Sequence, residues 1–162
     1  MDLFTTDELY GLWETANFNF YACNSSYPLA NGEHTANARN LVGDFLSKAD
    51  ACISGRRHGA SLRFGHDGNI IPLTALLKID GCHSDAIEPE DLAAGGYANF
   101  RISPMASNLQ MIFFRNNKNA DDILVRVLLN EKPATLPIES AGSGLYSWSV
   151  LRPYLAGIAC AD

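Results

Sequence analysis

The chain has 162 residues, of which 47% are hydrophobic and 19% are charged, a composition that predicts one globular domain with a sizeable core. Its formal net charge of −6 argues against a nucleic-acid-binding surface, which needs a basic footprint. No run approaches the roughly 20 apolar residues of a membrane span, and the first ten residues, MDLFTTDELY, lack the basic start and apolar core of a signal peptide. We therefore expect neither nucleic acid nor a membrane as a partner.

The first third of the chain predicts two helices. Thr5 and Glu8 have the spacing of a capping box, and the apolar residues that follow predict a helix over residues 6–21. A loop rich in Asn, Ser, Pro and Gly comes next. A second set of apolar residues at helical spacing predicts a helix over residues 34–53, which Gly55 would end.

The middle of the chain predicts a strand followed by a helix. Residues 61–64 fit a short strand, and residues 69–78 fit a helix with Pro72 in its first turn, where proline is tolerated. The stretch over residues 80–107 is typical of a loop, with one helical turn over residues 89–93.

Two apolar runs and a final helix complete the chain. Residues 109–115 and 123–129 are nearly continuous apolar runs, which predicts a hairpin of two strands buried on both faces. The last helix is predicted over residues 146–159, with Pro153 as a kink or boundary. The fold class is therefore α/β or α+β. Because three strands make a thin sheet, we expect another chain, or a larger fold, to supply the missing neighbours.

The junction after the predicted strand carries a histidine and an aspartate side by side, His66 and Asp67, between Gly65 and Gly68. Such junctions present side chains and backbone N–H groups to a ligand, and the flanking glycines leave room for a substrate to approach. Asn69 could cap the helix or touch the substrate. From the residues alone the alternative stays open that Asp67 is a helix N-cap beside a hydrogen-bonded turn histidine.

Other candidates give weaker patterns. Arg63 lies on the predicted strand, where facing solvent is more common than binding phosphate. His34 and His83 are expected in loops, and Cys82 next to His83 is not the spacing of a metal site. The four cysteines contain no Cys-x-x-Cys pair, so no structural zinc site is predicted, and their even number permits disulfides without predicting them.

Several blocks of the sequence resemble the histidine acid phosphatase family. LRFGHDGNIIPLTALL is similar to the proton-donor segment of that family, in which His-Asp follows a strand of the sheet. PMASNLQMIFFRN and ILVRVLLNEKPATLPI look like the two strands that come next in the multiple inositol polyphosphate phosphatase, or phytase-like, branch, and LFTTDELYGLWE looks like a helix of its helical region. The resemblance covers nearly the whole chain, in family order.

The resemblance implies a fold and a division of the chain. It implies an α/β fold, as a partial phosphoglycerate-mutase-like sheet domain flanked by helices with part of a helical cap. The whole chain, residues 1–162, would be a single C-terminal portion of the family's domain. Residues 1–54 would belong to the cap and residues 55–162 to the sheet domain.

The resemblance also implies a reaction, the hydrolysis of phosphomonoesters, with phytate or lower inositol phosphates as the expected substrates. A histidine in an Arg-His-Gly-x-Arg-x-Pro segment would attack phosphorus and form a phosphohistidine. His66 would contact the phosphate and stabilise the transition state, and Asp67 would protonate the leaving alkoxide. Gly68 and Asn69 would lie at the substrate, and no metal or organic cofactor is implied.

The attacking histidine is not apparent in this chain. Arg57-His58-Gly59 lacks the second arginine and the proline of the nucleophile segment and lies immediately before the His-Asp strand, so we expect an exposed turn there. The partner implied is an N-terminal half that carries the nucleophile, and the chain is expected to be inactive alone. The alternative is a non-catalytic anion-binding or interaction module that pairs with such a half. By resemblance the parent enzyme would be periplasmic or secreted.

Overall fold

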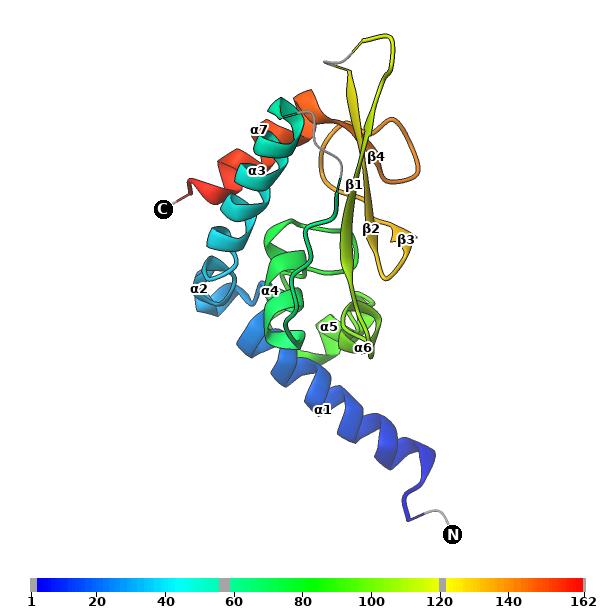
Figure 1. Ribbon diagram of the computed structural model, residues 1–162. Helices are drawn as coiled ribbons and strands as arrows, with labels where there is room; N and C mark the ends of the chain where they lie inside the picture. Colours follow the sequence, from blue (N-terminus) through cyan, green and yellow to red (C-terminus); the bar gives the residue numbers. More distant parts are fainter. Residues whose placement is uncertain (1–2, 56–58, 120–121, 162) are drawn as a thin grey trace.

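The computed structural model of the protein describes residues 3–55, 59–119 and 122–161 (Figure 1). Its helices are α1 (Thr6–Asn24), α2 (Glu33–Ala36), α3 (Arg39–Ser54), α4 (Asp67–Leu76), α5 (Pro89–Ala94), α6 (Asn99–Ile102) and α7 (Trp148–Ala159), with a short 3₁₀ turn over Pro28–Ala30. Its strands are β1 (Leu109–Arg115), β2 (Ile123–Leu129), β3 (Lys132–Pro133) and β4 (Leu145–Ser147). The predicted mixed α/β class is confirmed.

The sheet is built around one antiparallel hairpin. β1 pairs with β2 along its whole length, with Phe113 opposite Val125, as the two apolar runs predicted. On its other side β2 pairs with β3 and with β4, where Val125 lies opposite Tyr146. β1 is therefore an edge strand among the described strands. An edge strand leaves one row of backbone N–H and C=O groups free to pair with another strand.

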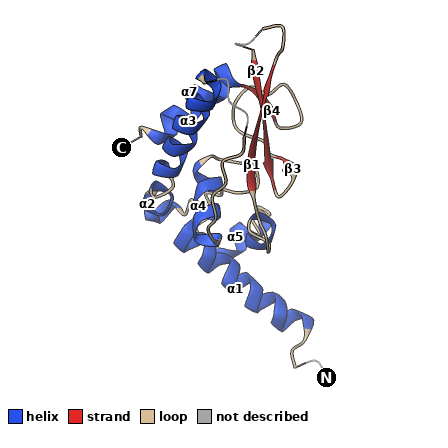
Figure 2. Ribbon diagram, in the orientation of Figure 1, coloured by secondary structure: helices blue, strands red, loops and turns tan. Residues whose placement is uncertain are grey.

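Helices lie on one side of this sheet in the view of Figure 2. The ring of Phe113 meets the ring of Trp148, at the start of α7, with 5.2 Å between centroids. On the other face of the same strand Ile112 and Phe114 are exposed. The prediction that both apolar runs are buried on both faces is therefore wrong. Residues 112–114 of β1 are exposed, and β2 buries only its alternate residues Ile123, Val125 and Val127.

The helices share one apolar core with the sheet. α3 and α7 lie side by side, and Arg152 of α7 forms an ion pair with Asp50 of α3 through Nη2 and Oδ2 at 2.8 Å. The core contains buried residues from both ends of the chain, among them Tyr21, Val42, Leu46, Ile71, Leu77, Val125, Val127, Tyr146, Leu151 and Leu155. Burial of this apolar surface is the main force that holds the helices on the sheet.

The first helix begins as the sequence predicts. The hydroxyl of Thr5 accepts the N–H of Glu8 at 3.3 Å, and the Glu8 carboxylate accepts the N–H of Thr5 at 2.7 Å, which completes the capping box. The first turns of α1 extend away from the other elements in Figure 1. Its last turns are packed inward, where the Tyr21 hydroxyl donates to the carbonyl of Ser84 at 2.8 Å.

Four boundaries differ from the predictions. The single helix predicted over residues 34–53 is two, α2 and α3, because the chain tightens into a turn in which Ala38 N–H donates to the Thr35 carbonyl. Residues 61–64 are extended but belong to no strand. The helix predicted to begin at residue 69 begins at Asp67. The last helix begins at Trp148 because residues 145–147 pair with β2 instead.

Two proline positions also differ. Pro72 lies inside α4 and not in its first turn, and Pro153 lies inside α7 without ending it. Proline within a helix removes one backbone donor, and burial of the surrounding apolar side chains offsets that loss here. No helix within the described ranges has the length and apolar character that crossing a membrane requires.

Candidate functional site

The candidate site lies at the start of α4. His66 is the N-cap of this helix and Asp67 is its first residue. The Asn69 Oδ1 atom accepts the backbone N–H of His66 at 3.3 Å. Asn69 therefore caps the helix, one of its two predicted roles, while the alternative prediction of Asp67 as the N-cap is wrong by one residue, since His66 holds that position.

His66 and Asp67 project onto an open surface. Their side chains are 78% and 48% exposed, and the His66 Nδ1 atom lies 3.5 Å from the Asp67 Oδ1 atom. The same carboxylate oxygen accepts the backbone N–H of Gly68 at 2.8 Å. An exposed imidazole and carboxylate at the N-terminus of a helix can donate and accept protons beside an anion that the helix dipole favours. The side chains of this pair can thus reach a substrate that approaches from outside.

The two glycines beside the pair make room for the protein's own side chains. A Cβ atom on Gly65 would lie 2.7 Å from Asn69 Oδ1, and one on Gly68 would lie 3.1 Å from His66 Cε1. Both distances are shorter than ordinary contacts, so a side chain at either glycine would displace the Asn69 amide or shift the His66 ring. We predicted that these glycines admit a substrate, and in this conformation the space holds Asn69 and His66.

A residue from the end of α1 also lies near the site. The Asn24 Oδ1 atom is 3.9 Å from the position that a Cβ atom on Gly68 would take, while its Nδ2 atom donates to the Phe20 carbonyl. No pattern in the sequence singles out Asn24, because an asparagine at the end of a helix before a polar loop is common. Its proximity to Gly68 arises from the packing of α1 against α4.

The segment before the site, residues 59–65, is extended and makes no backbone hydrogen bond with any described residue. Leu62 is 75% exposed and Phe64 is 93% exposed. Arg63 points the other way, where its guanidinium forms an ion pair with Asp44 and lies over the Phe45 ring, 4.7 Å from the ring centroid. As predicted, Arg63 is an exposed residue, and its guanidinium is engaged by Asp44 and Phe45 of α3.

Packing accounts for several other aromatic and histidine side chains. Trp148 is buried against Phe113, and the Tyr154 hydroxyl donates to the Leu77 carbonyl at 2.8 Å. Burial raises the pKa of Tyr154 to about 12, so it stays protonated. His83 Nδ1 lies 3.2 Å from the Ile79 carbonyl, and the described residues contain no group of three or more His, Cys, Asp or Glu that could hold a metal ion. Arg57 and His58 lie outside the described residues.

The cavity found among the described residues does not include the candidate pair. This cavity, of about 420 Å³, lies at the opposite end of α4, and neither His66 nor Asp67 lines it. His66 and Asp67 both lie on the exposed surface, so a further segment would be needed to enclose a substrate around them. One exposed edge of a site is therefore present. It consists of His66 and Asp67, the cap at Asn69, and residues 59–65, whose backbone makes no hydrogen bond with the described residues.

A family model described as histidine phosphatase superfamily, branch 2, matches residues 1–130. The match includes His66, Asp67 and both strands of the hairpin. No curated protein matches the chain.

Proposed function

The chain belongs to the histidine phosphatase superfamily, branch 2, and we propose that it supplies the proton donor of an enzyme that hydrolyses phosphomonoesters. The observation that carries the proposal is the adjacent, exposed pair His66 and Asp67 at the start of α4, within the matched region. Membership of the family indicates hydrolysis of the phosphatase type. The roles of individual residues, the substrate and the partner segment are our proposals.

Asp67 is the proposed general acid. An alkoxide is a poor leaving group unless it is protonated as the P–O bond breaks, and a positioned acid contributes roughly 10²- to 10⁴-fold to such a step. His66, next to it, would donate a hydrogen bond to a phosphate oxygen and stabilise the charge that develops there. Gly68 and Asn69 would contact the substrate through the first turn of α4, where the helix dipole favours an anion.

The nucleophilic histidine is proposed to come from a segment other than the described residues. Support comes from the extended residues 59–65, whose backbone groups have no described partner, and from the exposed side chains of Leu62 and Phe64. Support also comes from β1, an edge strand with Ile112 and Phe114 exposed on the uncovered face of the sheet. An added strand would satisfy these backbone groups and cover this apolar surface.

The proposed substrates are inositol polyphosphates, phytate included. This choice depends on the resemblance of ILVRVLLNEKPATLPI to the inositol polyphosphate phosphatase branch, and the strand β2 and the turn after it are the structural counterpart of that block. Export of the parent enzyme to the periplasm or outside the cell is proposed on the same resemblance.

The test of the proposed function is reconstitution. The chain alone is expected to leave p-nitrophenyl phosphate and phytate intact. With a polypeptide that carries the Arg-His-Gly-x-Arg-x-Pro segment, added separately or fused ahead of the chain, both substrates are expected to release inorganic phosphate. Sustained turnover by the chain alone would contradict the proposal that the nucleophile lies elsewhere, and absence of turnover in the reconstituted protein would contradict the phosphatase assignment.

Limited digestion with chymotrypsin tests the pairing surface separately from the chemistry. In the chain alone, cleavage is expected first after Leu62 and Phe64, because both are exposed in a segment without backbone hydrogen bonds. The added polypeptide should slow these cleavages by about tenfold or more, as expected when an opening costs a further 1.4 kcal/mol. Phe4, exposed ahead of α1, serves as an internal control whose cleavage should not change. Equal cleavage with and without the partner would contradict the proposed surface.

A further inference from the structure

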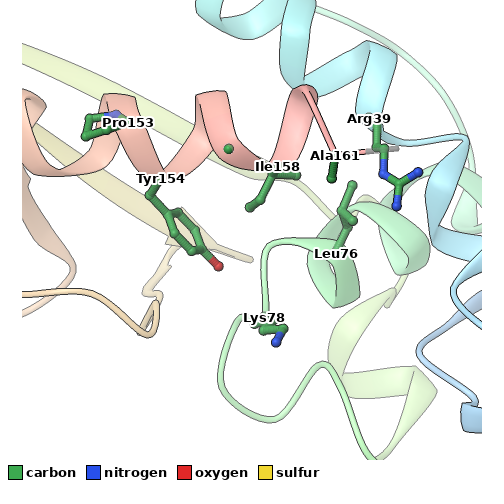
Figure 3. Close-up of a pocket in the computed structure, with 8 residues that line it drawn as sticks. Arg39, Leu76, Lys78, Pro153, Tyr154, Ile158 and Ala161 are labelled. Atoms are coloured by element: carbon green, nitrogen blue, oxygen red, sulfur yellow. The ribbon is translucent and has the colours of Figure 1, made fainter.

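A cavity of about 420 Å³ lies between α3, α4 and α7, at the end of α4 opposite the candidate site (Figure 3). Its volume falls in the range of small-molecule sites, roughly 300–1,000 Å³. The apolar part of its lining comes from Leu76, Pro153, the Tyr154 ring and Ile158. In Figure 3 Tyr154 and Ile158 project from α7 toward α4, and Leu76 projects from α4 toward α7.

Two cations also line this cavity, Arg39 from the start of α3 and Lys78 just after α4. In Figure 3 Leu76 lies between them. Neither forms an ion pair with any described residue, in contrast to Arg63 and Arg152, which both bind aspartates. The lining of this cavity is therefore locally positive, although the chain as a whole has a formal net charge of −6.

The guanidinium of Arg39 also lacks a hydrogen bond. Its Nε atom is buried and has no hydrogen-bond partner among the described residues. A buried donor without a partner costs free energy that a bound acceptor would recover. Both Arg39 and Lys78 line the cavity, and arginine is suited to binding carboxylate or phosphate by two parallel hydrogen bonds.

Tyr154 contributes its ring and not its hydroxyl. The hydroxyl donates to the Leu77 carbonyl, which orients the ring against the cavity and removes its polar atom from the lining. The polar groups that a ligand would meet are therefore the two cations, and the rest of the surface is apolar. This combination is complementary to a molecule with an anionic head on an apolar body.

We propose that the cavity between α3, α4 and α7 binds a small amphiphilic anion, with its carboxylate or phosphate head at Arg39 and Lys78 and its apolar body against Leu76, Tyr154 and Ile158. The site shares no residue with the pair at the start of α4. It is independent of the proposed phosphatase function, since it requires neither a nucleophile nor turnover.

Titration of the full chain with four probes tests the proposal, with backbone amide NMR shifts as the readout. Octanoate and octyl phosphate carry the two possible heads, octanol carries only the apolar body, and inorganic phosphate carries only the charge. We expect saturable shifts around residues 76–78 and 154–158 with one or both anionic amphiphiles, at an affinity at least tenfold higher than for octanol or phosphate. The affinity should fall as salt is raised, because salt screens the ion pairs. Equal affinity for octanol, or no saturable binding of either anion, would overturn the proposal.

Substitutions at the two cations locate the head. Arg39→Gln and Lys78→Gln are each expected to weaken octanoate or octyl phosphate binding by roughly 5- to 30-fold, as for loss of a charged hydrogen bond. Arg126→Gln and Lys132→Gln are the matched controls, because both residues are exposed and neither lines the cavity. Equal effects of the control and test variants would contradict the assignment of the head.

A substitution at Gly157 tests whether the apolar body of the ligand occupies the cavity, without weakening the fold. Gly157 lines the cavity inside α7, and a Cβ atom there would have no other atom within 4 Å. Gly157→Leu therefore places a side chain in the open space while raising helix propensity, so binding should be lost with an unchanged or higher melting temperature. Gly11→Leu is the control, since Gly11 is also inside a helix with open space at its Cβ position but lies in α1. Retained binding in Gly157→Leu would show that the ligand does not occupy this cavity.

Discussion

The Oδ1 atom of Asn69 lies 3.3 Å from the His66 backbone nitrogen and would lie only 2.7 Å from a Cβ atom on Gly65. The Asn69 side chain thus caps the first turn of α4, and it occupies the space that a side chain at residue 65 would need. Gly65→Ala should displace the Asn69 amide, and Asn69→Ala should remove the cap at a cost of about 0.5–2 kcal/mol in the free energy of unfolding.

The two substitutions are expected to be non-additive. Because each removes the same hydrogen bond, Gly65→Ala should cost less in the Asn69→Ala background than in the native chain. Urea unfolding of the four proteins measures the coupling free energy. Strict additivity would contradict the contact between Gly65 and the Asn69 side chain as the reason for the glycine.

A second prediction concerns Tyr146, which is buried beneath the turn that follows β3. Its hydroxyl donates to the Ala134 carbonyl at 2.9 Å and accepts the Leu136 N–H at 2.8 Å. Tyr146→Phe leaves both backbone groups buried without a partner, so the free energy of unfolding should fall by about 1–3 kcal/mol. Tyr10→Phe, on the exposed face of α1, should change it by no more than about 0.5 kcal/mol. Equal urea midpoints for the two variants would contradict the role given to the Tyr146 hydroxyl.

A third prediction distinguishes a general acid at residue 67 from a merely structural aspartate. In the reconstituted enzyme, Asp67→Asn should lower kcat by roughly 10²- to 10⁴-fold for an alkyl phosphate, whose alkoxide must be protonated to leave. The loss should be much smaller for p-nitrophenyl phosphate, because nitrophenolate leaves without a proton. A purely structural defect would lower both rates by the same factor.

The matched control for residue 67 is Asp91. Asp91 and Asp67 are both exposed acidic residues in the first turn of a helix, so their replacement by asparagine removes a similar interaction with the helix dipole. Asp91→Asn should therefore leave both phosphatase rates unchanged. If Asp91→Asn lowered them as Asp67→Asn does, the assignment of the proton donor would fail.

Some features could be predicted because their causes are local. The capping box at Thr5 and Glu8 joins residues three apart, and the β1–β2 hairpin joins two apolar runs across a short polar insert. Both patterns are complete within a few neighbouring residues. The junction at His66 and Asp67 could be predicted for the same reason, because its flanking glycines lie directly ahead of the apolar residues of a helix.

Other features depend on residues far away in the chain. Residues 61–64 have the composition of a strand, but a strand also needs a partner, and none among the described residues pairs with them. Residues 146 and 147 fit the start of the predicted last helix, but in the structure they pair with β2 as part of β4. The approach of Asn24 to Gly68 likewise joins α1 to α4, and no pattern within either helix indicates it.

The last prediction concerns Cys82, which is buried beside Tyr97 while Cys23, Cys52 and Cys160 are exposed free thiols. Burial raises the pKa of the Cys82 thiol from 9.0 to about 11. The unfolded chain therefore loses this proton near pH 9, whereas the folded chain keeps it until about pH 11. The contribution of this thiol to the free energy of unfolding is fully present below pH 9. It is lost as pH rises from 9 to 11, with a slope of up to about 1.4 kcal/mol per pH unit.

Urea unfolding of the native chain and of Cys82→Ser between pH 8 and 10 measures this slope as a difference, because Tyr97 and Tyr154, whose pKa is raised to about 12 by folding, contribute equally in both proteins. Cys82→Ser replaces the thiol by a group that does not titrate there, so its stability should fall less steeply with pH than that of the native chain. In native protein at pH 8 a thiol reagent should label three cysteines quickly and Cys82 only on unfolding, because reaction needs an accessible thiolate. Rapid labelling of all four, or identical pH slopes for the two proteins, would contradict the burial of Cys82 in the core.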